Sequence, residues 1–203
     1  AEYFNTDLSS LNPGNRGYDF FVYGTLPIFI IRYVGEWTAQ TSYDAITYLG
    51  RLLSALAELG TILLVFLIGL KLYDKWVGLL AAAFYAFAVL PIQQAHFMTV
   101  DTFTNLFGMT TVLAAVLISQ RKTQLAAFEA GSPWQSKAAE IWPYLFFGLA
   151  LGAATASKIN AAALALLLPA VEAVRYFHTP PEQRPRQFSI TWKLVLTAAL
   201  VSL

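Results

Sequence analysis

A histidine, an aspartate and two glutamines lie close together between two long apolar segments. The residues are Gln93, Gln94, His96 and Asp101. Polar and ionisable side chains at membrane depth are costly, so they usually mark a functional site or a contact between helices. An ordinary solvated loop, in which Asp101 or Thr99 caps the following helix, is the alternative interpretation. A single His–Asp combination is specific neither for a metal ion nor for proton transfer, so metal binding stays open.

Two cations are candidates for holding an anion. Lys158 falls between two short apolar segments, and lysine binds phosphate as a point charge. Arg51 stands at the head of the first long apolar segment. Snorkelling of the Lys158 side chain to the lipid headgroups explains its position equally well.

Glu58 is a carboxylate inside a segment that is otherwise apolar. Arg51, Ser54 and Glu58 are spaced i, i+3 and i+7, which places them on one stripe of a helix. An unpaired carboxylate at this depth is expensive. We therefore expect Glu58 to face the bundle and to pair with Arg51 or with a polar group on a neighbouring span. The stripe is either a structural lock between helices or the wall of a polar cavity with Arg51 at its mouth.

The composition indicates a polytopic membrane protein. Of the 203 residues 57% are apolar and only 12% are charged, and the mean hydropathy is +0.56. Soluble domains have roughly 25% charged residues. The chain contains no cysteine, so disulfides are excluded. Membrane lipid is the expected partner, and no nucleic-acid partner is expected.

The elements that must position these residues are helices. We expect an all-α, polytopic transmembrane bundle with about five complete spans and a truncated sixth. Residues 1–50 are expected to form an extracytoplasmic loop with interfacial helices over 19–37, and residues 51–203 to form the bundle. The expected spans lie near residues 52–72, 76–92, 99–119, 142–157, 159–177 and 190–203. Because the last run has 14 residues and a span needs about 20, the chain is interpreted as a fragment of a longer protein.

The distribution of positive charge predicts the topology. Alternating spans place 71–75, 120–141 and 172–193 on one side, with nine of the 13 lysines and arginines. Cytoplasmic loops carry an excess of these residues, so this side is expected to be cytoplasmic. His96, Asp101 and Lys158 would then share the extracytoplasmic face, most simply of a bacterial cytoplasmic membrane.

Several short segments resemble one enzyme family. The segments are Glu2-Tyr3-Phe4-Asn5-Thr6, Leu11-Asn12-Pro13, Phe21-Val22-Tyr23-Gly24-Thr25-Leu26-Pro27, Gly50-Arg51-Leu52-Leu53-Ser54-Ala55-Leu56, His96-Phe97 with Asp101, and Ala156-Ser157-Lys158-Ile159-Asn160. In order and placement they resemble the polyprenyl-phosphate-dependent glycosyltransferases of the GT-C class. More narrowly, the chain is similar to bacterial members of the dolichyl-phosphate-mannose protein mannosyltransferase family, which are related to lipid A aminoarabinose transferases.

The resemblance implies a larger fold with an outward-facing cavity that receives a polyprenyl-phosphate sugar donor. The family's catalytic acidic pair would lie upstream of Ala1, so no catalytic residue is expected in this chain, which would be inactive alone. Arg51 and Lys158 would hold the donor phosphate, and His96 and Asp101 would shape the cavity or assist an ion such as a divalent cation. No cofactor is otherwise implied, and the sugar and its acceptor stay open.

Two other classes of function compete with this interpretation. One is a non-catalytic accessory subunit of a larger membrane assembly, for example an electron-transfer or photosynthetic complex. The other is a transporter, which is weaker because the sequence shows no internal repeat and no pair of broken helices.

Overall fold

The computed structural model describes residues 5, 7–9, 12–17, 23–121 and 134–202, and this part of the chain is helical almost throughout. The α-helices are α1 (Leu26–Trp37), α2 (Tyr43–Leu72), α3 (Lys75–Ala86), α4 (Val89–His96), α5 (Val100–Gln120), α6 (Trp134–Ser157), α7 (Leu167–His178) and α8 (Arg184–Ser202). Short 3-10 helices are η2 (Pro13–Arg16), η4 (Ile159–Leu166) and η5 (Pro181–Gln183). The all-α expectation is confirmed.

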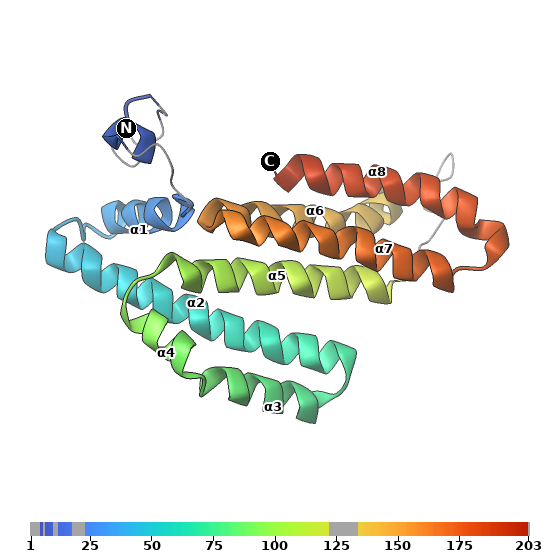
Figure 1. Ribbon diagram of the computed structural model, residues 1–203, viewed down its shortest axis with the longest axis horizontal. Helices are drawn as coiled ribbons and strands as arrows, with labels where there is room; N and C mark the ends of the chain where they lie inside the picture. The colour runs from blue at the N-terminus through green and yellow to red at the C-terminus, as the bar shows by residue number, and fades with distance from the viewer. Residues whose placement is uncertain (1–4, 6, 10–11, 18–22, 122–133, 203) are drawn as a thin grey trace.

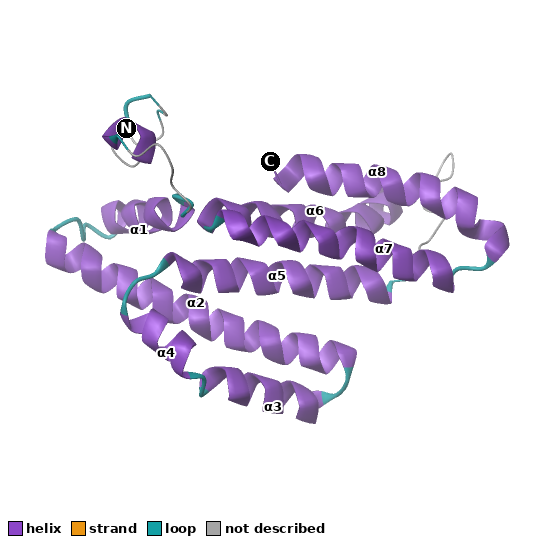
Figure 2. Ribbon diagram, viewed as in Figure 1, coloured by secondary structure: helices purple, strands orange, loops and turns teal. Residues whose placement is uncertain are grey.

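The long helices run alternately in opposite directions, so the chain passes back and forth between two ends of an elongated bundle (Figure 1). One end gathers α1, the start of α2, the start of α5 and the junction of α6 with η4. The other gathers the α2–α3 turn, the end of α5 and the connection from α7 to α8. Short loops join most neighbouring helices (Figure 2). These alternating directions are the ones assumed above when the positive charges on each side were counted.

Four helical segments are long and apolar enough to cross a membrane: Tyr43–Leu72, Val100–Gln120, Ala138–Ser157 and Ile159–His178. A fifth crossing is possible in length if α3 and α4 act together, although they are bent by 56°. The apolar part of α8, Gln187–Ser202, is shorter than a full span. The chain is therefore an integral membrane protein by length and composition, as expected.

The second predicted span, 76–92, is not one continuous helix. It breaks at Phe87 and Ala88, between α3 and α4. The cause is Pro91, whose ring would collide with the carbonyl of residue 87 and which has no amide hydrogen to donate. After the break the chain stays helical as far as His96, so Gln93, Gln94 and His96 lie on α4 and not in a loop as predicted.

The first span begins earlier than predicted. Helix α2 starts at Tyr43 and not near residue 52, because the Ser42 side chain accepts a hydrogen bond from Ala45 N and Asp44 lies in the first turn. Both features stabilise a helix N-terminus. The added turns carry exposed Tyr43 and Tyr48. Hydropathy marks where a helix is apolar, and it does not mark where the helix begins.

Helix α6 also begins before its predicted boundary of 142 and contains Pro143. A proline leaves the carbonyl four residues earlier without its helical partner. That carbonyl, Ala139 O, instead accepts a hydrogen bond from the Arg121 guanidinium at the end of α5. The first half of the fifth predicted span is the 3-10 helix η4, and only the second half, α7, is α-helical.

The core of the bundle and the α2–α3 hairpin are both closely packed. Around a core in α5–α8, the largest fully buried side chains include Phe147 and Ile118. Between α2 and α3, a Cβ built on Gly69 would lie 2.6 Å from Gly78 Cα. This contact allows the α2–α3 hairpin to close, as small residues commonly do between membrane helices.

Some predictions fall outside the described residues. These are the segment Glu2–Phe4 with Thr6, Leu11, the stretch 18–22 at the start of the predicted interfacial region, and residues 122–133 of the predicted cytoplasmic connection. Within the rest of 19–37 the structure has one helix, α1, which buries Pro27, Ile31 and Gly35 along a single stripe and exposes Tyr33 and Trp37. Its placement at a membrane interface stays a prediction.

Candidate functional site

Lys158 occupies the sharp turn between α6 and η4. It is the one residue between the two helices, and its backbone is extended, with φ −157° and ψ 122°. Its amide still donates to Ala154 O of α6 at 2.9 Å, and its carbonyl accepts from Ala161 N at 2.9 Å. Lys158 is therefore fixed at the end of the bundle, because its own backbone groups bond to both helices.

Asp101 lies opposite, in the first turn of α5. Lys158 Nζ donates to Asp101 Oδ1 at 2.6 Å, and Gln94 Nε2 donates to Asp101 Oδ2 at 3.3 Å. The two ion-paired side chains are 27% and 28% exposed, so the pair is neither dry nor fully solvated. Two residues that the sequence predicted separately, 57 positions apart, are brought together.

Tyr23 and Gly24, just before α1, contact the backbone of the same turn. Tyr23 and Lys158 form an isolated antiparallel bridge, and Gly24 N donates to Ser157 O at 2.9 Å. A Cβ on Gly24 would lie 1.8 Å from Ala156 O, so only glycine fits at this approach. Lys158 Nζ also lies 5.5 Å from the centre of the Tyr23 ring, within the range of a cation–π contact.

Arg51 and His96 are at the same end of the bundle but do not join this cluster. Arg51 is exposed and has no ion pair or hydrogen bond from its side chain to any described residue. Its neighbour Gly50 packs against Met98, which places Arg51 near the connection from α4 to α5. His96 is exposed, and its Nδ1 lies 2.7 Å from Ile92 O of its own helix. Gln93 is likewise exposed.

Glu58 behaves as expected for a carboxylate inside a bundle. It is 5% exposed, and it accepts hydrogen bonds from Tyr85 Oη at 2.7 Å and Asn105 Nδ2 at 3.2 Å. The prediction that it pairs with a neighbouring span is confirmed, while the proposed partner Arg51 is wrong. Ser54 on the same stripe is fully buried, and its Oγ has no hydrogen-bond partner among the described residues.

A second buried polar cluster was not anticipated from the sequence. Glu172 Oε1 accepts from Tyr144 Oη and from Arg175 Nη1, the latter at 2.7 Å, and Arg175 Nη1 lies 2.6 Å from Tyr144 Oη. All three residues are less than 10% exposed. The i, i+3 spacing of Glu172 and Arg175 near the end of a predicted span was the available signal.

The hydrogen-bond donors at the Lys158 end suit an anion better than a metal ion. An ammonium group carries three donors, and Asp101 uses one of them. The first amides of α5 point toward the same end and favour negative charge there. Among the described residues no group of three or more histidines, aspartates or glutamates could hold a metal ion.

Comparison with known proteins gives no family for this chain. No protein-family model, curated protein or solved structure matches it.

Proposed function

We propose that this chain is part of a polyprenyl-phosphate-dependent glycosyltransferase of the GT-C class, in a bacterial cytoplasmic membrane. The end of the bundle that holds Lys158 and Asp101 faces the extracytoplasmic side and meets the phosphate of the lipid-linked sugar donor. The observation that supports this is the meeting of Lys158, Asp101 and Tyr23 at one partly exposed turn. All three residues belong to the segments that carry the family resemblance.

In this proposal the Asp101 carboxylate binds Lys158 in the position that the phosphate would occupy. It holds the Lys158 ammonium in position and neutralises it while the site is free of ligand. The phosphodiester of the donor carries one negative charge, as the Asp101 carboxylate does, and its two non-bridging oxygens accept charge-assisted hydrogen bonds from an ammonium group. The incoming phosphate displaces Asp101 from the Lys158 ammonium, and the α5 N-terminus adds its amide dipoles. Arg51, on the same end, attracts the anion from the membrane surface.

The test measures binding of decaprenyl phosphate to the protein in nanodiscs, with decaprenol as the ligand that lacks the phosphate. Lys158→Ala should weaken decaprenyl phosphate binding about tenfold or more, since an ion pair with phosphate is lost. Asp101→Asn should strengthen binding, because it keeps the shape of the side chain and frees the lysine. Lys193→Ala, which removes an exposed lysine on α8, is the matched control and should change nothing.

The opposite signs separate a phosphate site from a structural ion pair. If the pair only holds the fold together, both substitutions should lower stability and neither should raise affinity. If decaprenyl phosphate binds no better than decaprenol, the proposal fails. The accessory-subunit interpretation then becomes the better one, and partner proteins that copurify with the chain would identify its assembly.

A further inference from the structure

Two cavities adjoin at the opposite end of the bundle, the first between α7 and α8 and the second between the end of α5, α7 and the connection from α7 to α8. The first, here called the aromatic cavity, has a volume of about 510 Å³. The second, the arginine cavity, has a volume of about 620 Å³. Gln187, which is 4% exposed, lines both of them. Volumes of this size suit small-molecule ligands.

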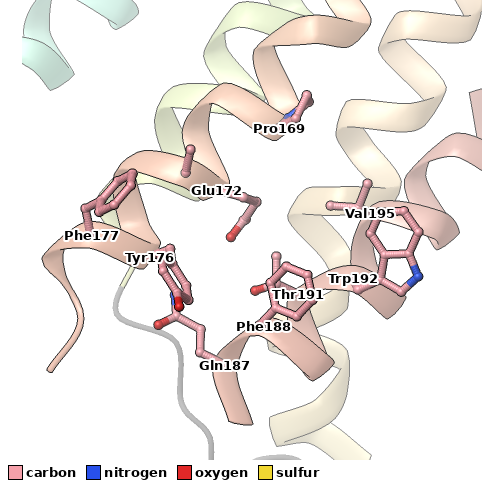
Figure 3. A pocket seen from close by; sticks show the side chains of 10 residues that line it. Pro169, Glu172, Tyr176, Phe177, Gln187, Phe188, Thr191, Trp192 and Val195 are labelled. Atoms are coloured by element: carbon pink, nitrogen blue, oxygen red, sulfur yellow. The ribbon is translucent and has the colours of Figure 1, made fainter. Parts of the chain in front are cut away.

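The aromatic cavity is built for hydrocarbon. Its walls include Pro169, Phe177, Phe188, Trp192 and Val195, and Figure 3 shows these side chains around the space between the two helices. Phe177, Phe188 and Trp192 are more than half exposed, so the cavity opens to the surface of the bundle. In a membrane protein that surface meets lipid chains, and aromatic rings commonly gather near the headgroup level.

Two buried oxygens in this apolar wall have no partner among the described residues. They are Glu172 Oε2 and Thr191 Oγ1, on residues that are 7% and 9% exposed. Figure 3 shows the Glu172 carboxyl pointing from α7 into the space beside α8. Because Tyr144 and Arg175 both bond to Oε1, Oε2 still needs a donor. A buried acceptor without a donor is costly, so these atoms point to a ligand that carries a hydroxyl or amine hydrogen.

The arginine cavity is lined by basic side chains, whereas the aromatic cavity is mostly apolar. Arg121, Arg175 and His178 line it, and its described lining residues include no carboxylate. Basic pockets between membrane helices bind the phosphate of lipid headgroups. The 2.7 Å ion pair between Arg175 and Glu172 connects the two cavities directly.

We propose that the two cavities together bind one molecule of an anionic, hydroxyl-bearing phospholipid of the phosphatidylglycerol type. An acyl chain fills the aromatic cavity, the phosphate lies by Arg121 and Arg175, and a headgroup hydroxyl donates to Glu172 Oε2. A choline lipid has no donor for Glu172. An ethanolamine lipid has a donor but no net charge to complement the arginines. This site is separate from the Lys158 end and does not depend on the function proposed there.

The experiment uses quenching of tryptophan fluorescence by brominated acyl chains. The protein is reconstituted in phosphatidylcholine vesicles that contain a small fraction of brominated phosphatidylglycerol, phosphatidylethanolamine or phosphatidylcholine. We expect brominated phosphatidylglycerol to reach half-maximal quenching at about a tenfold lower fraction than the choline lipid. Trp192→Phe should remove this extra quenching, because Trp192 lines the aromatic cavity.

Two matched substitutions on α7 test the position of the lipid. Ala173 lines the aromatic cavity and Ala170 is exposed without lining it. Ala173→Phe should abolish the preference for phosphatidylglycerol by filling the cavity, while Ala170→Phe should keep it. Arg121→Gln should raise the half-maximal fraction several-fold. Equal quenching by the glycerol and choline lipids, equal quenching by the glycerol and ethanolamine lipids, or equal effects of the two alanine substitutions would each overturn the proposal.

Discussion

The contact between Glu58 and Tyr85 gives the sharpest test of how this bundle is held together. Glu58 lies on α2, Tyr85 on α3 and Asn105 on α5, so one carboxyl group ties three helices. Glu58→Leu removes the acceptor and replaces it with an apolar side chain of similar size. It leaves the Tyr85 hydroxyl and the Asn105 amide without their partner.

The expected loss of stability follows from these two contacts. Hydrogen bonds between membrane helices contribute about 0.6 kcal/mol on average and up to about 1.7 kcal/mol. A buried polar group left without a partner costs about 1–3 kcal/mol. Glu58→Leu should therefore lower the free energy of unfolding by about 2–4 kcal/mol. Glu58→Gln should cost less than about 1 kcal/mol, because its amide oxygen can accept from Asn105 and its NH₂ group can donate to the Tyr85 oxygen.

The assay is reversible unfolding in mixed micelles with increasing SDS, in a double-mutant cycle of Glu58→Leu and Tyr85→Phe. We expect a coupling energy of about 0.6–1.7 kcal/mol between these two positions. Tyr48→Phe, on the exposed side of α2, is the control and should show no coupling. A coupling energy near zero, or a Glu58→Leu protein as stable as the original, would refute the reasoning. Equal losses for leucine and glutamine would contradict the smaller loss expected for glutamine.

Three further predictions test other parts of the structure. Gly24→Ala should break the contact of Tyr23 and Gly24 with the turn at Lys158 and lower the free energy of unfolding by about 1–3 kcal/mol, because the added Cβ meets the Ala156 carbonyl. Faster proteolysis of the first 24 residues would reveal this loss. Ser54→Ala should be neutral or stabilise the protein by up to about 1 kcal/mol in the same SDS assay, because it removes a buried hydroxyl that has no partner in the described chain; a loss would contradict this. In this cysteine-free chain an impermeant thiol reagent should label Arg16→Cys in intact cells and Tyr73→Cys only after lysis, and the reverse pattern would invert the topology.

Sequence reasoning could predict what depends on composition and local pattern. Apolar length identified the crossing segments, and the cost of a buried carboxylate predicted that Glu58 would face inward. It failed where one residue overrides a pattern. Pro91 breaks a segment that hydropathy reads as continuous, and Ser42 starts a helix several residues before the apolar run begins.

The candidate site could be predicted only in part, because helical phase along one span does not determine which other span lies opposite. The spacing of Arg51 and Glu58 favoured a pair on one stripe, yet Arg51 is exposed and Glu58 finds its partners on two other helices. Lys158 and Asp101 were singled out for their chemistry, and their contact depends on how α5 packs against the turn between α6 and η4. The Glu172 cluster was missed because its residues read as the charged end of a span.

The polar contacts also explain how such an apolar chain selects one packing arrangement. In lipid, apolar side chains gain little by leaving the bilayer for another helix, so apolar burial alone does not fix helix order or register. The contacts of Glu58, Asp101 and Glu172 join residues 27, 47, 57 and 28 positions apart. Each is satisfied only when particular helices lie side by side at one register. Near the Lys158 end, the same ion pair that fixes the register also holds a cation at the surface. A ligand that displaces Asp101 would therefore loosen a helix contact as it binds, which couples occupancy of this site to the packing of α5 against α6.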